Sequence, residues 1–458
     1  MKHSKIIPIF KSGCKNEPSN YRPVSVLPAL SKIFERMVLD QMMSHFSKYK
    51  IFHHRQYGFT RGRSTTDAGA KLVSHILEAW ESSQDAIGIF CDLSKAFDCV
   101  DHDTLILKLK HYGLRGQSSE LVLSYLSTRQ QTVGVNGVTS SGSLIRMGVP
   151  QGSILGPFLF LAYINDLPYM MDDLTDIILF ADDTSLIFKI DRKMKDLNYL
   201  NGDLEKLSDW FSTNNLLLNT SKTKCLKFSL PNVRSQSDLN LMLDGEKLDF
   251  INDTVFLGIT IDSKLQWGAH ITTLSKRLSS AAFAVRKIRQ LTDVPTAKLV
   301  YYAYFHSIMS YGILLWGSAA DVESIFILQK RAIRAIYCMS PRESLRNTFK
   351  EINILTLPAL YILENIMYIR KNLQSFSINS DHHNINTRNK DKLVVPRYRL
   401  TKTNTKSFLG NSIRFYNKLP KEITSLPNKK FKTCIKSKLI KKAYYTVRDY
   451  VEDKHAWN

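Results

Sequence analysis

The sequence has few cysteines and none in a paired motif. Six occur in 458 residues, without a Cys-x-x-Cys pair or a regular spacing, at positions 14, 91, 99, 225, 338 and 434. This scatter argues against a disulfide-stapled scaffold and against a structural zinc site, and it is typical of a reducing compartment.

Membrane-spanning and secretory segments are also missing. The most apolar stretch, Ile154–Ile164, contains Gly156 and Pro157 and is far shorter than the roughly 20 residues that span a bilayer. The N-terminus lacks the long apolar core and small-residue cleavage site of a secretory signal. We therefore expect an intracellular protein that neither spans a membrane nor is secreted.

Acidic residues are scarce relative to basic ones. The chain has 63 Lys and Arg against 41 Asp and Glu, a formal charge of +22, and residues 384–458 hold 19 basic and 5 acidic residues. Such a surface attracts a polyanion through counterion release, although a solubilising tail explains the charge equally well. Aromatic residues in this tail could stack on unpaired bases, but we expect most to pack a small helical core. They are Tyr398, Phe408, Phe415, Tyr416, Phe431, Tyr444 and Tyr445.

The remaining composition predicts a folded chain of two or three domains. Apolar residues make up 44% of it, with only 14 prolines, so it can bury a core. Apolar periodicity and turn signals predict a mixed α/β region followed by a largely helical one, with a polar linker at 375–392. The expected helices include residues 30–45, 68–82, 197–214 and 271–291. The expected strands are 87–92, 132–136, two within 177–190, 224–229 and 254–261, with a hairpin turn at 136–137.

Three carboxylates stand out by their context. Asp92 ends a buried apolar run, and Asp182 and Asp183 lie between two apolar runs, at the predicted tip of a hairpin. Adjacent side chains on a continuous strand point to opposite faces, so the paired acids converge only where the chain turns. Anions among apolar residues need a compensating cation, and Mg²⁺ favours carboxylate and phosphate oxygens. An ordinary surface turn explains an isolated Asp-Asp pair better.

Several segments around these acids resemble the sequence motifs of reverse transcriptases. Three segments resemble their successive palm motifs, in the required order: Cys91-Asp92-Leu93-Ser94-Lys95-Ala96-Phe97-Asp98, Gly148-Val149-Pro150-Gln151-Gly152-Ser153 and Phe180-Ala181-Asp182-Asp183. Residues 20–25 and 56–65 resemble the fingers, and residues 219–223 and 256–259 resemble the later palm and primer-grip motifs. The residues within these motifs are similar to those of polymerases from jockey-like (LINE-type) retrotransposons, which lack long terminal repeats. The similarity extends weakly to Phe415–Pro420.

This resemblance implies an α+β, right-hand polymerase fold. Fingers and palm, with an antiparallel palm sheet, are expected at 1–262, a helical thumb or connection at 263–374, and a basic, mainly helical C-terminal region at 375–458. The resemblance also implies an RNA-directed DNA polymerase that uses an RNA template, a DNA primer or target, and dNTPs. It suggests access to the nucleus, whereas no membrane or protein partner is inferred.

The resemblance assigns the metal chemistry to the acids. Two Mg²⁺ ions, with Mn²⁺ as a substitute, would clamp the attacking and leaving oxygens of phosphoryl transfer. Asp92 and Asp182 are expected to bridge the ions, with Asp183 as an auxiliary ligand and the backbone carbonyl of Leu93 completing one coordination sphere.

Further residues are expected to bind the nucleotide. Phe97 lies where the family has an aromatic gate against a 2′-hydroxyl, although a core phenylalanine is an equal alternative. Arg61 and Arg63 could hold the triphosphate through bidentate contacts, with Arg22 as a weaker candidate; solvated loop arginines are the commoner case. Thr60 departs from the family pattern, which often has Arg at this position. The contact with the triphosphate could therefore be made by a neighbouring residue instead.

Two more motifs complete the expected site. Gln151 and Gly152 form a permissive loop in which backbone can approach the templating base or the sugar, unless they are a plain turn. Lys222 matches the family's lysine that protonates the leaving pyrophosphate, although an exposed lysine before a strand is unremarkable.

Two other functions remain open on the sequence alone. Nothing ahead of the fingers-like segment could be an endonuclease, so we expect a fragment or truncated copy of an element. The alternative to a polymerase is a decayed or repurposed copy that binds RNA without synthesis. The intact acids, with Gln151 and Lys222, favour activity. A DNA-templated polymerase or maturase-like factor would use the same site on other partners.

Overall fold

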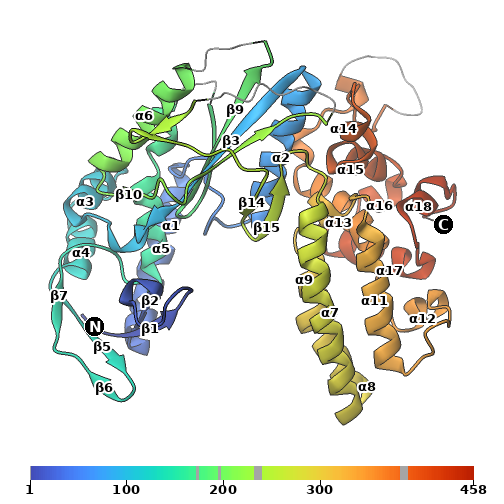
Figure 1. The fold of residues 1–458 in the computed structure, drawn as a ribbon, viewed down its shortest axis with the longest axis horizontal. Coiled ribbons are helices and arrows are strands. Elements are labelled where there is room, and N and C mark those ends of the chain that lie inside the picture. Colours follow the sequence, from blue (N-terminus) through green and yellow to red (C-terminus); the bar gives the residue numbers. More distant parts are fainter. Residues whose placement is uncertain (1, 172–174, 194–197, 232–239, 382–389, 458) are drawn as a thin grey trace. The chain divides into compact units, whose positions relative to one another are not determined.

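The structure, a computed structural model, describes residues 2–171, 175–193, 198–231, 240–381 and 390–457. The chain forms two compact units. Unit 1 comprises residues 1–68, 86–227 and 234–251, and unit 2 comprises residues 69–85, 228–233 and 252–458. Helix and strand are mixed in the first half, and the second half is mostly helical (Figure 1). The predicted mixed architecture is therefore confirmed, whereas the centre of the predicted linker, 382–389, lies outside the described residues.

A four-stranded sheet forms the centre of unit 1, in the strand order β11-β3-β9-β8. The strands are β3 (Gln84–Cys91), β8 (Thr175–Phe180), β9 (Asp183–Asp191) and β11 (Lys224–Phe228). β8 and β9 pair antiparallel, from Thr175 opposite Phe188 to Phe180 opposite Asp183. The predicted buried strand before Asp92 and the predicted hairpin around the paired acids are both confirmed.

Besides this sheet, the described part of unit 1 contains five α-helices. They are α1 (Ala29–Lys48), α3 (His102–His111), α4 (Gln117–Leu126), α5 (Leu155–Ile164) and α6 (Asn198–Thr213). α5 is apolar on every side, as expected of a helix at the centre of a core. Its Leu159 and Phe160 share one cluster of buried residues with Ile87 and Ile89 of β3. The most apolar segment of the sequence is therefore a core helix.

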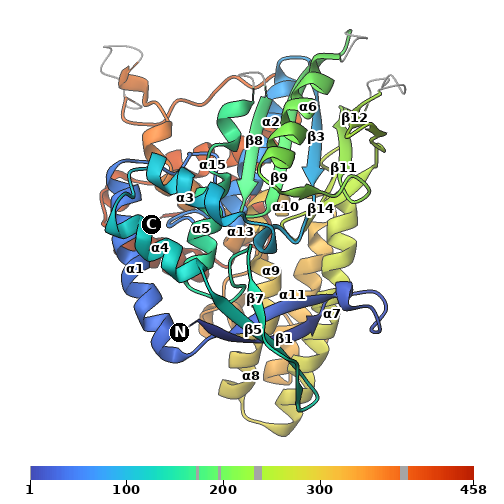
Figure 2. The ribbon, with the colours of Figure 1, turned by 90° about the vertical axis from the view of Figure 1, so that its left-hand side faces the viewer.

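A second sheet of unit 1 joins segments far apart in the sequence. β1 (His3–Phe10) pairs antiparallel with β2 (Tyr21–Val26). It pairs in parallel with β5 (Arg129–Val135), which lies beside it in Figure 2. β5 also pairs with β6 (Val138–Thr139) and β7 (Ser143–Ile145). Asn136 and Gly137 both have positive φ, the conformation that a two-residue hairpin turn requires. The predicted hairpin is confirmed.

Unit 2 is built around two long helices. α7 (Gly268–Leu291) and α11 (Val322–Tyr337) lie side by side (Figure 1, Figure 2). The apolar stripe of α7 is buried, including Leu274 and Leu278, while Lys276 and Arg277 are exposed. The predicted amphipathic helix with a basic outer side is thus confirmed.

The other helices of unit 2 are mostly shorter than these two, although α2, which begins in unit 1, has 17 residues. They are α2 (Thr65–Glu81), α8 (Val294–Val300), α9 (Ser307–Ser310), α10 (Ile313–Trp316), α12 (Arg346–Glu351), α13 (Leu357–Lys371), α14 (Thr401–Thr405), α15 (Phe408–Asn417), α16 (Lys421–Thr424), α17 (Asn428–Lys442) and α18 (Val447–Glu452). A π-helical segment, Tyr301–His306, joins α8 to α9. None of the helices in the described ranges is long and apolar enough to cross a lipid bilayer.

One predicted strand is wrong. Residues 254–261 form a hairpin of β14 (Asp253–Phe256) and β15 (Ile259–Asp262) instead of a single strand. The chain reverses at Leu257 and Gly258, both with positive φ. The apolar alternation continues on both sides of the turn, so periodicity alone does not show the break.

The basic C-terminal region is a packed helical structure. Phe408, Phe415, Phe431 and Tyr450 are buried, and Phe415 contacts Tyr450 edge-to-face at 5.2 Å between ring centroids. Most of the tail aromatics singled out in the sequence are buried, which confirms that they pack a core. The lysines of α17 include exposed side chains at 429, 430, 432, 436 and 441.

Glu35 offers a test of how unit 1 positions its central helix. Its fully buried carboxylate accepts hydrogen bonds from the backbone N–H groups of Ile154 (2.7 Å) and Leu155 (3.2 Å) at the start of α5. Glu35→Ala leaves both donors buried and unpaired, which costs about 2–3 kcal/mol and lowers Tm by about 4–8 °C. Thermal unfolding measures this. Arg36→Ala, at an exposed neighbour, is the control, and equal Tm values for the two variants would contradict the role of Glu35.

Candidate active site

Strand order brings the three predicted acids to one end of the central sheet. Asp92 directly follows β3, and Asp182 and Asp183 occupy the turn between β8 and β9. β3 and β9 are neighbours in the sheet. Ala181, with a φ of 56°, makes the sharp turn that separates the paired acids from β8. The structure therefore brings together carboxylates that are about 90 residues apart in sequence.

These carboxyl groups act on one another electrostatically. Burial first, and then the negative charges of Asp182 and Asp92, raise the pKa of Asp183 to about 6. Burial, followed by a smaller effect of Asp92, also raises the pKa of Asp182. Both residues are nevertheless exposed to solvent, so the acids lie at the surface of unit 1 and are only partly desolvated. Its negative charge is only partly compensated by the protein.

Two cations from the β1–β2 hairpin provide that partial compensation. Arg22, in β2, lowers the pKa of Asp182, and Lys11, directly after β1, lowers the pKa of both paired acids. The sequence suggested Arg22 as a weaker phosphate ligand but gave no signal for Lys11. The closeness of Lys11 to the acids follows from the pairing of β1 with β2, which the sequence does not reveal. Cations beside the paired acids are suited to an anionic ligand that arrives with a divalent cation.

The donor set fits a hard divalent cation. Carboxylate oxygens are preferred ligands of Mg²⁺, and the raised pKa values show that the acids lack enough positive charge around them. Within the described ranges, no three His, Cys, Asp or Glu side chains form a ready-made ligand cluster. Leu93 begins β4 (Leu93–Ser94), which pairs with β10 (Leu217–Leu218) and so fixes the backbone beside Asp92.

Lys222 lies beside Asp92. Its Nζ is 3.9 Å from an Asp92 carboxylate oxygen, with 65% and 42% of the two side chains exposed. The turn that carries it is tied to the same strand end, because the backbone N–H of Asn219 donates to the carbonyl of Asp92 at 2.9 Å. The Asn219 side chain in turn accepts from the backbone N–H of Lys222. An exposed ion pair of this length is weak, so the ammonium can move.

Phe97 and the loop of Gln151 belong to one hydrogen-bonded unit. The backbone N–H of Val149 donates to the carbonyl of Phe97 at 2.8 Å, and the Gln151 side chain donates to Asp98 at 3.0 Å. The half-buried Phe97 ring stacks on Phe160 of α5, with centroids 4.5 Å apart. The aromatic ring and the loop are therefore positioned by the same core helix.

Two glycines allow this loop to approach its neighbours. A Cβ on Gly148 would lie 2.7 Å from the carbonyl oxygen of Asp98, and one on Gly152 would lie 2.7 Å from the carbonyl oxygen of Ser25. Both have positive φ. Gly152 was expected from the sequence to allow a close backbone approach. Here the close neighbour is β2, and Gly148 is a further glycine with the same constraint.

Arg61 and Arg63 are placed away from the acids' immediate electrostatic surroundings. Arg63 donates to the backbone carbonyls of His54 and Gln56 and lies over the ring of Tyr57, so it braces its own loop. Arg61 is exposed and lines a groove between α1 and α5. Neither is among the charges that shift the pKa of Asp182 or Asp183.

Gln56 and Gly58 contact the turn that carries Asp182 and Asp183, and they hold this acidic turn against the rest of unit 1. The Gln56 side-chain oxygen accepts from the backbone N–H groups of Gly58 (2.8 Å) and Ala181 (3.2 Å). A Cβ on Gly58 would lie 2.4 Å from the Ala181 nitrogen. Both residues lie in the fingers-like segment recognised in the sequence, but this buried contact with the turn was not foreseen.

Known proteins are similar to this chain in sequence. The family profile described as "Reverse transcriptase (RNA-dependent DNA polymerase)" matches residues 9–261. The chain is 33% identical to the probable RNA-directed DNA polymerase from transposon BS of Drosophila melanogaster, over 73% of this chain and 38% of that protein. It is 31% identical to the RNA-directed DNA polymerase from mobile element jockey of the same species, over 73% and 37%. The chain thus spans little more than a third of the curated relatives it matches.

Solved structures that resemble the chain include telomerase from Candida tropicalis in complex with a fragment of telomeric RNA. That match has 11% sequence identity and a TM-score of 0.44, and it covers 100% of this chain and 64% of the telomerase chain.

The raised pKa of Asp183 predicts a stability effect that depends on pH. A carboxyl group whose pKa is higher when folded binds its proton more tightly in the folded chain, so its destabilising effect grows as pH rises from the ordinary value of 3.8 through about 6. Asp183→Asn should therefore raise Tm more at pH 7.5 than at pH 4.5, measured by thermal unfolding in EDTA. Asp191→Asn, at the exposed end of β9, is the control. A gain that is larger at pH 4.5 would contradict the assigned environment.

Proposed function

Because this chain belongs to the reverse transcriptase family, we propose that it is the polymerase segment of a retrotransposon protein without long terminal repeats, and that it copies RNA into DNA. The observation that carries the proposal is the electrostatic coupling of Asp92, Asp182 and Asp183 at the ends of neighbouring strands, opposite Lys11 and Arg22. Burial raises the pKa of the paired acids while cations lower it, as expected at a site that receives metal ions and phosphates.

The proposed reaction is transfer of a nucleotide to a primer. The primer 3′-hydroxyl oxygen attacks the α-phosphorus of a dNTP, the bond to the bridging oxygen breaks, pyrophosphate leaves, and the hydroxyl proton is lost to solvent. Two divalent ions, Mg²⁺ or Mn²⁺, supply charge neutralisation for the attacking and leaving oxygens. Asp92 and Asp182 are the proposed bridging ligands, with Asp183 and the Leu93 carbonyl as auxiliary ones. The carboxylates must be ionised to bind, so a pKa of about 6 for Asp183 favours function above that pH.

Residues around the acids orient the nucleotide in this proposal. Lys11 and Arg22 neutralise the triphosphate, a task for which an arginine fork is well shaped. Arg61 and Arg63 remain proposed phosphate ligands because the family resemblance implies that role. Lys222 is the proposed proton donor to pyrophosphate, and its loose ion pair with Asp92 leaves its ammonium free to turn.

The sugar and template contacts are proposed for the loop unit of Phe97. Phe97 would exclude a 2′-hydroxyl, and its stacking on Phe160 would keep the ring rigid enough to do so. Gln151 and Gly152 would bring backbone close to the templating base. The hydrogen bond from Gln151 to Asp98 would keep this loop in register with Phe97.

The proposed subdomain layout follows the family pattern. Residues 1–262 would form fingers and palm, 263–374 the thumb or connection, and 375–458 a basic C-terminal region. The proposed partners are an RNA template and a DNA primer. Residues 252–458 hold 34 Lys and Arg against 14 Asp and Glu, whereas residues 1–251 hold 29 against 27. The helical half therefore provides the positive charge that a nucleic-acid backbone requires.

Primer extension tests the proposed function. On poly(rA) primed with oligo(dT), with Mg²⁺ or Mn²⁺, we expect the wild type to incorporate dTTP and Asp182→Asn/Asp183→Asn to lose at least about 100-fold, the scale for loss of one charge-stabilising group. Asp191→Asn removes a carboxylate from the same strand and should keep activity. Equal incorporation by all three proteins would refute the site. No incorporation by any, with RNA still bound, would favour a decayed RNA-binding copy.

Phe97 provides a test of sugar selection. Phe97→Val removes the ring but keeps an apolar side chain, so the ratio of rNTP to dNTP incorporation should rise by about 10- to 200-fold, the range for one steric contact. Single-nucleotide extension with dTTP or UTP measures this ratio. Phe283→Val, which changes an exposed phenylalanine of α7, is the control. An unchanged ratio would show that Phe97 only packs the core.

A further inference from the structure

Helix α17 of unit 2 has a large excess of lysine (Figure 1). Seven of its 15 residues are Lys, and none is Asp or Glu. Lys438 and Lys442 are used inside unit 2, where they donate to the carbonyl of Trp457 and to the carboxylate of Asp453. The other five lysines have exposed side chains, at positions 429, 430, 432, 436 and 441. We call these five residues the lysine face.

The inner side of α17 is apolar and buried. Its buried residues are Phe431, Ile435, Leu439 and Ile440, and Phe431 is the one aromatic residue of the helix. A basic amphipathic helix binds a lipid surface by inserting its apolar side, and here that side is already packed inside unit 2. The lysine face therefore acts through charge, because α17 offers outward neither an apolar side chain to insert nor a ring on which a base could stack.

The lysines occupy positions that cost the helix stability. Lys429 and Lys430 are in the first turn, beside the positive end of the helix dipole, and no acidic residue in that turn offsets them. Lys432 and Lys436 are four residues apart, a spacing at which like charges repel. Glu364 of α13 gives partial relief, since burial raises its pKa and the charge of Lys432 lowers it. Local structure does not explain these charges, which is typical of residues that serve binding.

Helix α13 holds both ends of α17 in place. The Arg370 guanidinium of α13 donates to the side chain of Asn428 at 2.9 Å and lies 4.8 Å from the centre of the Phe431 ring. At the other end, the hydroxyl of Thr356, which caps α13, donates to the carbonyl of Tyr444 at 2.6 Å. The lysine face is therefore carried by a helix that is fixed at both ends, so little order is lost when a partner binds it.

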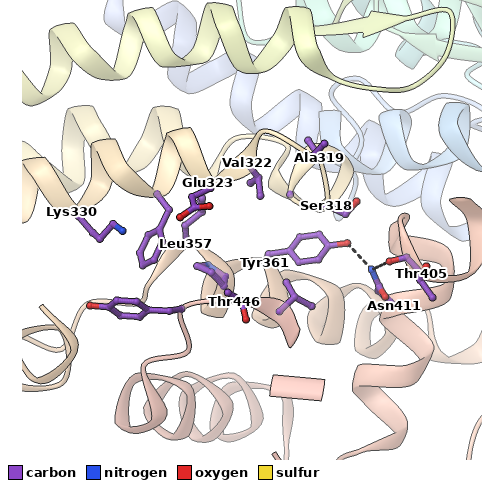
Figure 3. A pocket seen from close by; sticks show the side chains of 16 residues that line it. Ser318, Ala319, Val322, Glu323, Lys330, Leu357, Tyr361, Thr405, Asn411 and Thr446 are labelled. Carbon is purple, nitrogen blue, oxygen red and sulfur yellow. Dashed lines mark hydrogen bonds between the residues drawn. The ribbon is translucent and has the colours of Figure 1, made fainter. Parts of the chain in front are cut away.

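Helix α13 is in turn fixed to α15 through buried polar groups. The Asn411 amide donates to the Tyr361 hydroxyl at 3.2 Å (Figure 3), and the Ser412 hydroxyl donates to the Asn365 side chain at 2.7 Å. All four residues are buried. The basic C-terminal helices and α13 therefore form one packed body within unit 2.

The length and chemistry of the lysine face fit a nucleic-acid backbone. Lys429 and Lys441 are 12 residues apart, which corresponds to about 18 Å of helix. A double helix carries one phosphate charge per about 1.7 Å of its axis, so roughly ten phosphates of its two strands lie along that length. An ammonium group is a compact point charge that pairs with a phosphate without a fixed geometry, and so without reading the base sequence.

We propose that the lysine face binds the phosphate backbone of a nucleic-acid duplex, whatever its sequence. A duplex offers regularly spaced phosphates to a straight helix whose charges are already in place, whereas a flexible single strand has to be ordered first. The proposal goes beyond the proposed function, because it concerns a surface remote in sequence from the three acids and requires neither metal ions nor dNTPs. It assigns to the C-terminal region the task of holding a duplex.

The dependence of binding on salt tests the proposal. Lys429→Gln/Lys432→Gln/Lys436→Gln removes three charges that follow one side of the helix, at spacings of three and four residues. Dissociation constants are measured by fluorescence anisotropy in EDTA without dNTPs. The probes are two 20-bp DNA duplexes of unrelated sequence, a 20-bp RNA–DNA hybrid and a single strand of the same length.

The slope of log Kd against log salt should become less steep by about 2.7 on every duplex, or about 0.9 for each lost phosphate contact. Between 50 and 200 mM salt, the wild type should then lose about 40-fold more affinity than the variant. Lys430→Gln/Lys441→Gln, which removes the rest of the lysine face, should reduce the slope by about 1.8. Both variants should keep or raise Tm, since the lysines repel one another.

The matched control is Lys48→Gln/Lys50→Gln/Lys110→Gln, which removes three exposed lysines of unit 1 and should leave the slope unchanged. An equal decrease in this control would overturn the proposal, because net charge alone would then explain binding. An unchanged slope in both lysine-face variants would also overturn it, and so would a larger loss on the single strand than on the duplexes. Vesicles that contain phosphatidylserine test the lipid alternative: variants that lose vesicle binding and keep duplex binding would refute the proposal.

The measurements are repeated with Asp182→Asn/Asp183→Asn. Loss of polymerisation in that variant should leave the salt slopes and the effect of the lysine substitutions intact. A failure of the duplex-binding proposal is thereby distinguished from a failure of the proposed polymerase.

Discussion

Three carboxylates held at the ends of two neighbouring strands repel one another, and burial increases that cost. The pKa of Asp183 near 6 expresses both effects. Unit 1 maintains this arrangement because its core is large: most residues of the central strands are buried, and α5 is apolar and almost fully buried. The cationic hairpin of β1 and β2 supplies partial relief. The remaining negative charge favours a cation near these acids, and it is also the feature that weakens the fold.

Close backbone approaches hold the acids in place. Gly58 allows its segment to lie against Ala181, and Gly148 allows the loop of Gln151 to lie against Asp98. Any larger side chain at these positions would push a strand end away from the site. The hydrogen bond that the Gln56 side-chain oxygen accepts from the Ala181 N–H then fixes the acidic turn itself. Rigid positioning of charged groups in this way removes the need for reorganisation during a reaction.

Sequence reasoning predicted most of the elements and the main acids. Strand ends are marked by the change from apolar residues to Asp92, and the hairpin by symmetric apolar runs around Asp182 and Asp183. The break of the 254–261 segment was missed because the alternation continues across the turn. Lys11 was missed for a different reason. Its effect on the acids depends on the pairing of β1 with β2, and that pairing has no local signature near Lys11.

The pairing of β1 with β5 has a consequence for how the chain matures during synthesis. Lys5 lies opposite Thr132, so 127 residues separate the two partners. At about 5–20 residues per second, the ribosome takes roughly 6–25 s to deliver β5 after β1. During that interval β1 has β2 on one edge only, and its other edge offers unpaired backbone groups to any passing strand. Chaperone protection of this early hairpin would therefore matter more for this protein than for one with local strand pairing.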